Sequence, residues 1–155
     1  VKANPRINIP IIGNGDITSG EEARRRFEET GVDAVMVGRA TFGKPWIFAE
    51  INRALGKEPE FPLRGVIDSV HEPLSLDWKL DVLMNEVRQS VERNGSVGGL
   101  IHMRRHIAAS PLFKGIPDFR ATRIAMLRSE NIDEMLELME GTRPLLELGN
   151  ENIKP

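Results

Sequence analysis

The chain has 155 residues, of which 40% are hydrophobic and 28% charged, and its formal net charge is −2. This composition suits one soluble domain or two small ones. No apolar run approaches the roughly 20 residues that cross a bilayer, and residues 1–6 lack the apolar core of a secretory signal. We therefore expect a cytoplasmic protein without membrane contact.

Two residue types limit the chemistry of the chain. Cysteine is absent, which excludes disulfides, thiolate metal sites and cysteine catalysis within these 155 residues. The histidines are His71, His102 and His106, and they are too few and too scattered for a metal cluster. His102 and His106 lie four apart, but no HExxH-like glutamate accompanies them, so no metal site is predicted.

The opening of the chain predicts a strand followed by a helix. Residues 7–12 are apolar and β-branched, as in a strand, and the run stops at residues 13–16. The helix that follows is expected to end at Gly31, because glycine favours the position just after a helix. Its start is marked by a capping box, formed either by Thr18 with Glu21 or by Ser19 with Glu22.

A second strand and helix follow directly. Residues 32–37 form a nearly continuous apolar run, typical of a strand covered on both faces, and the run stops at Gly38. Pro45 fits the first turn of the next helix, and Gly56 closes it. The apolar positions of that helix recur every four residues, at Ile47, Ile51 and Leu55.

Beyond a segment rich in proline and glycine the apolar period changes to 3.6, which predicts a small helical bundle. The first helix has a stripe from Leu76 to Val91 and ends at Asn94-Gly95. An Asn131–Glu134 capping box opens the last one. The other positions expected to face inward are Val97, Leu100, Ile101 and Ile107, then Phe119, Ile124 and Leu127, then Ile132, Met135, Leu136 and Met139.

Two successive βα units imply parallel strands joined by a right-handed crossover. Since two parallel strands do not make a stable sheet alone, we expect either pairing with other material or the end of a longer barrel. The predicted fold is α/β plus all-α: the last two βα units of a TIM (β/α)8 barrel in residues 1–58, a linker in 59–76 and a helical domain in 77–155. An exposed edge of the partial barrel would favour self-association.

The residues that directly follow the two strands are candidates for binding a phosphate. In a (β/α)8 barrel these strand ends share one face, and the loops after the last strands commonly form a phosphate site. Glycine lets the backbone approach an anion, amides at a helix start point toward it, and a guanidinium grips two of its oxygens. Asp16 does not attract phosphate and is expected to cap a helix or hold a loop. The alternative is that the glycines only make tight turns.

Longer stretches of the sequence closely resemble the tRNA-dihydrouridine synthases, which are FMN-dependent enzymes with a TIM-barrel domain followed by a helical domain. The stretches are Ile9-Pro10-Ile11-Ile12-Gly13-Asn14-Gly15-Asp16-Ile17, Gly31-Val32-Asp33-Ala34-Val35-Met36-Val37-Gly38-Arg39-Ala40, Gly43-Lys44-Pro45-Trp46-Ile47-Phe48, Met103-Arg104-Arg105-His106 and Lys114-Gly115. The helical-domain match is looser, because Ala109-Ser110 stands where relatives often have aromatic residues.

The resemblance implies roles for particular residues. Those expected to bind the FMN phosphate and nearby atoms are Asn14, Gly15, Asp16, Gly38 and Arg39. The family's general acid is a cysteine on an earlier barrel loop. Because this chain has none, we expect no catalytic residue here, and we interpret the chain as the C-terminal part of such an enzyme.

The charge pattern adds a candidate RNA surface. Residues 102–128 carry six Lys or Arg against one acid, while residues 129–155 carry two basic residues against seven acids. In the resembling synthases the helical domain helps hold tRNA, mostly through phosphate contacts. The alternative is that the acidic stretch pairs internally with the basic one. Phe113 and Phe119 are available for base stacking but fit a core equally well. The candidate RNA-binding residues are Arg104, Arg105, His106, Lys114, Arg120 and Arg123.

The function expected of the intact protein is reduction of a uridine in tRNA to 5,6-dihydrouridine, using FMN and NAD(P)H. This chain would supply part of the phosphate site and a tRNA-contacting domain, and would be inactive alone. One alternative is an RNA-binding helical module without flavin. Another is the phosphate-binding end of a different FMN-dependent TIM-barrel oxidoreductase.

Overall fold

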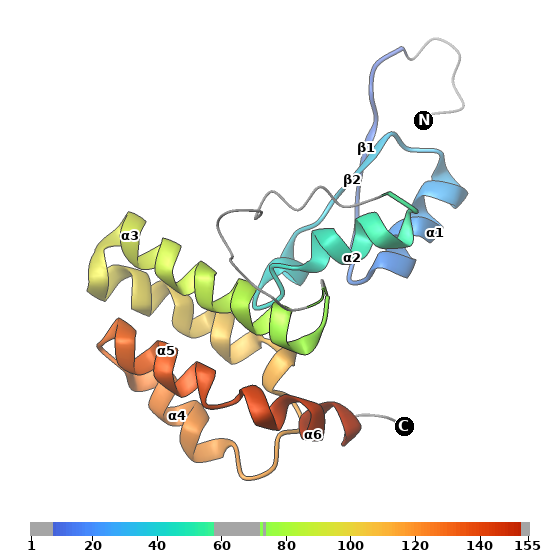
Figure 1. Ribbon diagram of the computed structural model, residues 1–155. Coiled ribbons are helices and arrows are strands. Elements are labelled where there is room, and N and C mark those ends of the chain that lie inside the picture. Colours follow the sequence, from blue (N-terminus) through green and yellow to red (C-terminus); the bar gives the residue numbers. More distant parts are fainter. Residues whose placement is uncertain (1–7, 58–71, 73, 153–155) are drawn as a thin grey trace. The chain divides into compact units, whose positions relative to one another are not determined.

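The computed structural model describes residues 8–57, 72 and 74–152 (Figure 1). Within these ranges the chain forms two compact units, which are described separately. Unit 1 contains residues 8–41 and 46–57, and unit 2 contains residues 42–45, 72 and 74–152. The predicted linker falls mostly outside the described residues. Among the helices that are described, none is long and apolar enough to span a membrane.

Unit 1 is built on two short parallel strands, β1 (Ile12–Asn14) and β2 (Ala34–Met36). Helix α1 (Gly20–Thr30) connects them, as the βα pattern predicted. The register pairs Ile12 with Ala34 and Asn14 with Met36, so the two strands end level with each other.

Both strands are shorter than predicted, and β1 begins later. Residue 7 lies outside the described residues, and strand pairing starts only beside Ile11, whose carbonyl accepts from the amides of Asp33 and Ala34. Proline at position 10 has no amide hydrogen to extend the ladder. The Asp33 carboxylate accepts the Ile11 amide at 2.8 Å, which fixes the start of the pairing.

The caps of α1 distinguish between the two predicted starts. The Ser19 hydroxyl accepts from the Glu22 amide at 3.1 Å, so Ser19 is the N-cap and the alternative with Thr18 is wrong. Gly31 adopts φ 63° at the C-terminal end, as predicted.

Helix α2 (Ile47–Ala54) begins after the N-cap Trp46, so Pro45 precedes the helix and does not lie in its first turn.

The core of unit 1 lies between the strands and the two helices. Ile17, Ala23, Ile47 and Ile51 are buried, and Val35 and Val37 pack against them. The prediction that the second strand is covered on both faces is wrong for this chain, because Met36 remains 54% exposed. Ile12 of β1 is likewise 65% exposed. One face of the sheet has helices on it, and apolar side chains of the strands remain in solvent.

Unit 2 is dominated by α3 (Leu76–Ala109), which folds back on itself as a helical hairpin (Figure 1). Gly95 has non-helical angles, φ 74° and ψ 166°, so the predicted break at Asn94-Gly95 is confirmed. We call residues 76–94 the first arm and residues 96–109 the second arm. The arms touch at Gly99, where an added Cβ would lie 2.5 Å from the Cα of Val91.

Further elements complete the bundle: η2 (Pro111–Phe113), α4 (Arg120–Arg128), α5 (Ile132–Glu140), η3 (Arg143–Leu145) and α6 (Leu146–Glu151). Helices α4 and α5 pack against α3 and against each other. Met126, Met135 and Met139 are fully buried, and Asn131 caps α5 as predicted. Three residues predicted to face inward are instead exposed, because each helix has its buried stripe on another side: Val97, Ile101 and Ile124.

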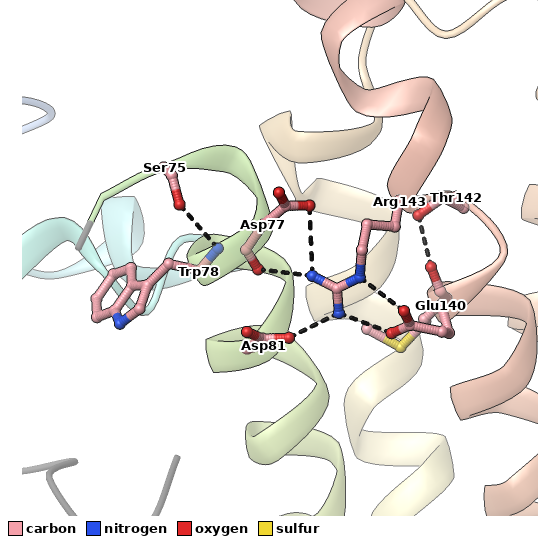
Figure 2. Close-up of polar contacts among 8 residues, drawn as sticks. Ser75, Asp77, Trp78, Asp81, Glu140, Thr142 and Arg143 are labelled. Atoms are coloured by element: carbon pink, nitrogen blue, oxygen red, sulfur yellow. Dashed lines mark hydrogen bonds and ion pairs between the residues drawn. The ribbon is translucent and has the colours of Figure 1, made fainter. Parts of the chain in front are cut away.

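Arg143 joins the C-terminal part of the bundle to the start of α3 (Figure 2). Its Nε lies 2.6 Å from the Glu140 carboxylate and its Nη2 lies 2.7 Å from that of Asp81. Its Nη1 also donates to the Asp77 backbone carbonyl at 3.3 Å. Hydrogen bonding to Glu140, with a further contribution from Asp81, raises the pKa of Arg143 above its already high ordinary value. This guanidinium is therefore a permanent charge that holds two helices together.

Candidate functional site

The two loops that follow the strands meet at one edge of the unit 1 sheet. Asn14 is the last residue of β1, and Gly15 and Asp16 continue from it. Gly38 follows β2 by two residues, and Arg39 begins the short 3₁₀ helix η1 (Arg39–Thr41). Because the strands are parallel and end in register, the two segments lie at the same edge.

An ion pair connects these two loops. Arg39 Nη2 lies 2.8 Å from Asp16 Oδ1, and the two side chains are 86% and 80% exposed. The role expected for Asp16 was capping a helix or holding a loop, and the structure shows that it holds the Arg39 loop. Ser19 is the cap of α1. Asp16 has φ 34°, an uncommon backbone region for a residue other than glycine.

The glycines of these loops face open space. A Cβ added to Gly15 or Gly38 would meet nothing within 4 Å. Packing therefore does not require glycine at either position, although the backbone of Gly15, with φ 155°, does favour it. The backbone there is accessible to a ligand, and the geometry fits a phosphate held by loop amides and one guanidinium.

The start of α1 is less suited to binding an anion. Ser19 accepts the Glu22 amide, and Glu21 and Glu22 place negative charge in the first turn. These carboxylates already interact favourably with the helix dipole and repel a phosphate. Anion binding at this edge would therefore depend on the loops and Arg39.

A pocket of about 190 Å³ opens beside the end of β1. Asn14 and Gly15 contribute to its rim, and Arg26 of α1 lies on its wall, where the guanidinium pairs with Glu22 at 2.8 Å. The remaining lining residues are Gly13, Ile17, Thr30, Val32 and Val35.

In unit 2, the six candidate RNA-binding residues divide into two groups. Arg104 is half-buried and donates to the Ser129 carbonyl at 3.4 Å, and Arg123 donates to the Ala108 carbonyl at 2.6 Å. His106 is only 8% exposed. These three side chains hold the second arm of α3 in the bundle. Arg123 is nevertheless exposed, as are the other three, Arg105, Lys114 and Arg120, which make no hydrogen bond or ion pair with a described residue.

Within the described residues, the basic stretch (102–128) does not form ion pairs with the acidic stretch (129–155). Lys114 and Arg120 make no side-chain hydrogen bond or ion pair with any residue that the structure describes. The acids of α5 have other roles there: Glu134 accepts from Ser129 Oγ at 2.6 Å, and Glu140 pairs with Arg143.

A buried histidine and a partly buried glutamate face each other across the α3 hairpin. His106 Nδ1 is 3.4 Å from Glu86 Oε1, without the alignment of a hydrogen bond. Burial, with smaller contributions from His102 and Arg105, lowers the pKa of His106, and burial raises the pKa of Glu86. No group of three or more His, Cys, Asp or Glu that could hold a metal occurs in the part of the chain that is described.

Phe113 and Phe119 are buried and stack on each other at 5.4 Å, so they belong to the core. Sequence patterns gave no reason to single out Phe42, which is 42% exposed and lies under the Arg105 guanidinium. A lone aromatic in a loop has no periodicity to reveal it.

Comparison with known proteins identifies the family. A sequence model described as dihydrouridine synthase matches residues 1–142. The chain belongs to the dihydrouridine synthase family. It is 36% identical over 137 residues to tRNA-dihydrouridine synthase B of Salmonella typhimurium, covering 87% of this chain and 38% of the relative.

Other similar proteins are also named as tRNA-dihydrouridine synthases, and each is longer than this chain. A probable tRNA-dihydrouridine synthase of Aquifex aeolicus is 30% identical over 133 residues, 86% of this chain and 37% of the relative. A tRNA-dihydrouridine synthase B of Pseudomonas aeruginosa is 50% identical over 56 residues, 36% of this chain and 17% of the relative. The chain therefore spans less than two fifths of the length of these relatives.

Proposed function

We propose that this chain is part of an FMN-dependent tRNA-dihydrouridine synthase that reduces uridine in tRNA to 5,6-dihydrouridine with NAD(P)H as reductant. Family membership and the meeting of the loops of residues 14–16 and 38–39 at one edge of the sheet support the proposal. On this proposal, unit 1 is the last two βα units of a TIM barrel, and the exposed side chains of Ile12 and Met36 are its surface toward further barrel strands.

The observation that carries the cofactor assignment is the Asp16–Arg39 ion pair. It connects two loops, each of which contains a glycine, Gly15 or Gly38, with no neighbouring atoms around its Cβ position. Asp16 occupies one nitrogen of the guanidinium, and the other nitrogens of Arg39 are not bonded within the described part of the chain. Arg39 and the amides at Gly15 and Gly38 would hold the FMN phosphate, with Asn14 at the rim and Asp16 orienting Arg39. FMN supplies hydride transfer between NAD(P)H and the uracil ring.

On this proposal the residues of this chain bind and orient the FMN phosphate and the RNA. The chain has no cysteine and so cannot supply a cysteine as proton donor. We therefore propose that the chain alone forms no dihydrouridine. Incubation with FMN, NADPH and unmodified tRNA, followed by nucleoside analysis, tests this directly, and formation of dihydrouridine would contradict it.

The phosphate assignment is tested by comparing FMN with riboflavin, which lacks the phosphate. The expected result is tighter binding of FMN in a flavin-fluorescence titration, with the preference lost in Arg39→Gln. Equal binding of the two flavins would contradict the phosphate assignment, and binding of neither would leave a flavin-free RNA-binding module.

The RNA assignment rests on Lys114 and Arg120, which are exposed and unpaired within the described residues. Filter binding of unmodified tRNA across a salt series should show weaker binding and a shallower salt slope in K114E/R120E. R53E/K57E is the charge-matched control, since Arg53 and Lys57 are both exposed in unit 1. Equal loss in both variants would mean that only net charge matters.

A further inference from the structure

Phe42 is an exposed aromatic on a rigid support. It lies in the 42–45 segment of unit 2, which packs on the end of the second arm of α3. The next residue, Gly43, has φ 66°, and a Cβ there would press on the His106 carbonyl and lie 2.5 Å from the Ser110 nitrogen. Only glycine permits this close approach, so the backbone beside Phe42 is fixed against the helix.

Single exposed apolar side chains are common and need no explanation by themselves. Phe42 differs because cationic and aromatic groups surround it. The Arg105 guanidinium carbon lies 5.2 Å from the centre of the Phe42 ring, and the His106 ring lies 5.3 Å away at an interplanar angle of 80°. The exposed His102 ring is 5.1 Å from that of His106.

Arg105 is well placed for a flat ligand. Within the described residues its guanidinium has no carboxylate partner, so its charge is not neutralised. Contact with the Phe42 ring restricts its orientation before any ligand binds, which reduces the entropy lost on binding.

We propose that Phe42 and Arg105 form a stacking platform for an unpaired nucleobase of the RNA, with His102 beside it. Aromatic rings and guanidinium planes are the surfaces on which single-stranded bases stack. This inference rests on the proposed RNA-binding function and adds a base contact to a surface otherwise assigned to phosphates. Phe113 and Phe119 do not provide that contact, because both are in the core.

The test uses two single-stranded probes of equal length and charge, oligouridine and the matching abasic ribose-phosphate oligomer. The chain should bind oligouridine more tightly, by roughly 5- to 100-fold for one stacked base. Phe42→Leu keeps an apolar side chain and should lose most of this preference, whereas Phe42→Trp should keep it. Neither variant should change the slope of affinity against salt, because no phosphate contact is removed.

The outcomes separate this inference from the proposed function. If both probes bind equally to the unaltered chain, or if Phe42→Leu keeps the preference, the platform is overturned while salt-dependent RNA binding through Lys114 and Arg120 stands. If the unaltered chain binds neither probe nor tRNA, both fail together. Circular dichroism of each variant shows whether the fold is retained, and Phe42→Trp provides the folded variant with a ring.

Discussion

The two units differ in how completely they bury their apolar side chains. Unit 2 encloses a core that includes five of the six methionines, Met84, Met103, Met126, Met135 and Met139. The sixth, Met36, lies on β2 of unit 1 and is 54% exposed. Helices satisfy their own backbone groups, so a bundle closes once its apolar stripes meet. A two-stranded sheet has unpaired edges and an uncovered face, and needs further strands.

The units also differ in how they use charge. On α1 of unit 1, Arg24, Arg25 and Arg26 pair with glutamates three or four residues away along one exposed helix. In unit 2, Arg143 pairs with Asp81, which is 62 positions away in sequence, and its side chain is only 21% exposed. Local pairs on a helix surface add little, whereas a partly buried pair between elements fixes their packing.

The largest effect is expected where the arms of α3 touch. Gly99→Ala would place a methyl group 2.5 Å from the Val91 Cα and 2.6 Å from the Ser90 carbonyl oxygen, forcing the arms apart. Overpacking of this kind lowers the free energy of unfolding by about 1–3 kcal/mol. Urea unfolding followed by circular dichroism measures it.

Gly98→Ala is the matched control for that hairpin contact. Its Cβ would have only the Asn94 side chain nearby, at 3.6 Å, an ordinary contact. Alanine is a better helix former than glycine by up to about 1 kcal/mol, so this variant should be unchanged or more stable. Equal destabilisation by both variants would show that the arms do not touch at Gly99.

The next effect concerns Arg143. Arg143→Met keeps a long apolar stem but removes the guanidinium that contacts Asp81 and Glu140. We expect the free energy of unfolding to fall by about 2 kcal/mol, less than for a fully buried pair. Arg24→Met removes pairs of similar geometry from the exposed face of α1 and should cause no measurable change. If the two variants behaved alike, the contrast between the units in their use of charge would be wrong.

The sequence predicted which helices and strands form more accurately than it predicted where each strand begins and ends. The change of period near residue 76, the break at Gly95 and the cap at Asn131 are local signals, and each is confirmed. The strand limits were wrong because pairing length depends on the partner strand, which no local pattern shows. Ile124 was assigned to the core from its spacing with Phe119 and Leu127, whereas in α4 it is Met126 that is buried and Ile124 is 41% exposed.

The site was predicted in part for a similar reason. Glycines after strands are visible in the sequence, but the pairing of Asp16 with Arg39 joins residues 23 positions apart and needs the register of the sheet. The sequence shows that a residue is arginine but not whether its guanidinium is free in solvent or bonded to a carbonyl. Arg104 and Arg123 therefore could not be distinguished from Arg105. Their hydrogen bonds to Ser129 and Ala108 appear only in the folded bundle.

A smaller effect is expected from pH in unit 2. The ordinary pKa of histidine is 6.5, and burial lowers that of His106 in the folded chain. The unfolded chain therefore takes up this proton first, and the stability contributed by neutral His106 is lost as pH falls from above 6.5 through the lowered pKa. His106→Gln should make the melting temperature less sensitive to pH between about 7.5 and 5.5.

Glu86 acts in the opposite direction and provides the control. Its pKa is raised above 4.5 by burial, so its contribution to stability increases as pH falls through the raised value. Glu86→Gln should therefore steepen the loss of stability toward acid. His102 and Arg105 also face His106 and are left unchanged. An unchanged pH profile in His106→Gln would contradict the lowered pKa.

The smallest effect should come from the strand surface of unit 1. Ile12 is 65% exposed, so Ile12→Val removes a methyl group from solvent and should change the free energy of unfolding by less than about 0.5 kcal/mol. The same substitution at Ile47, which is fully buried in that unit, should cost about 0.5–1.5 kcal/mol. Hydrogen exchange of the α2 amides measures both. A loss at Ile12 as large as at Ile47 would mean that the strand surface is covered in solution. Within the described residues nothing covers Ile12 and Met36. If a second molecule supplied the cover, the loss would depend on protein concentration.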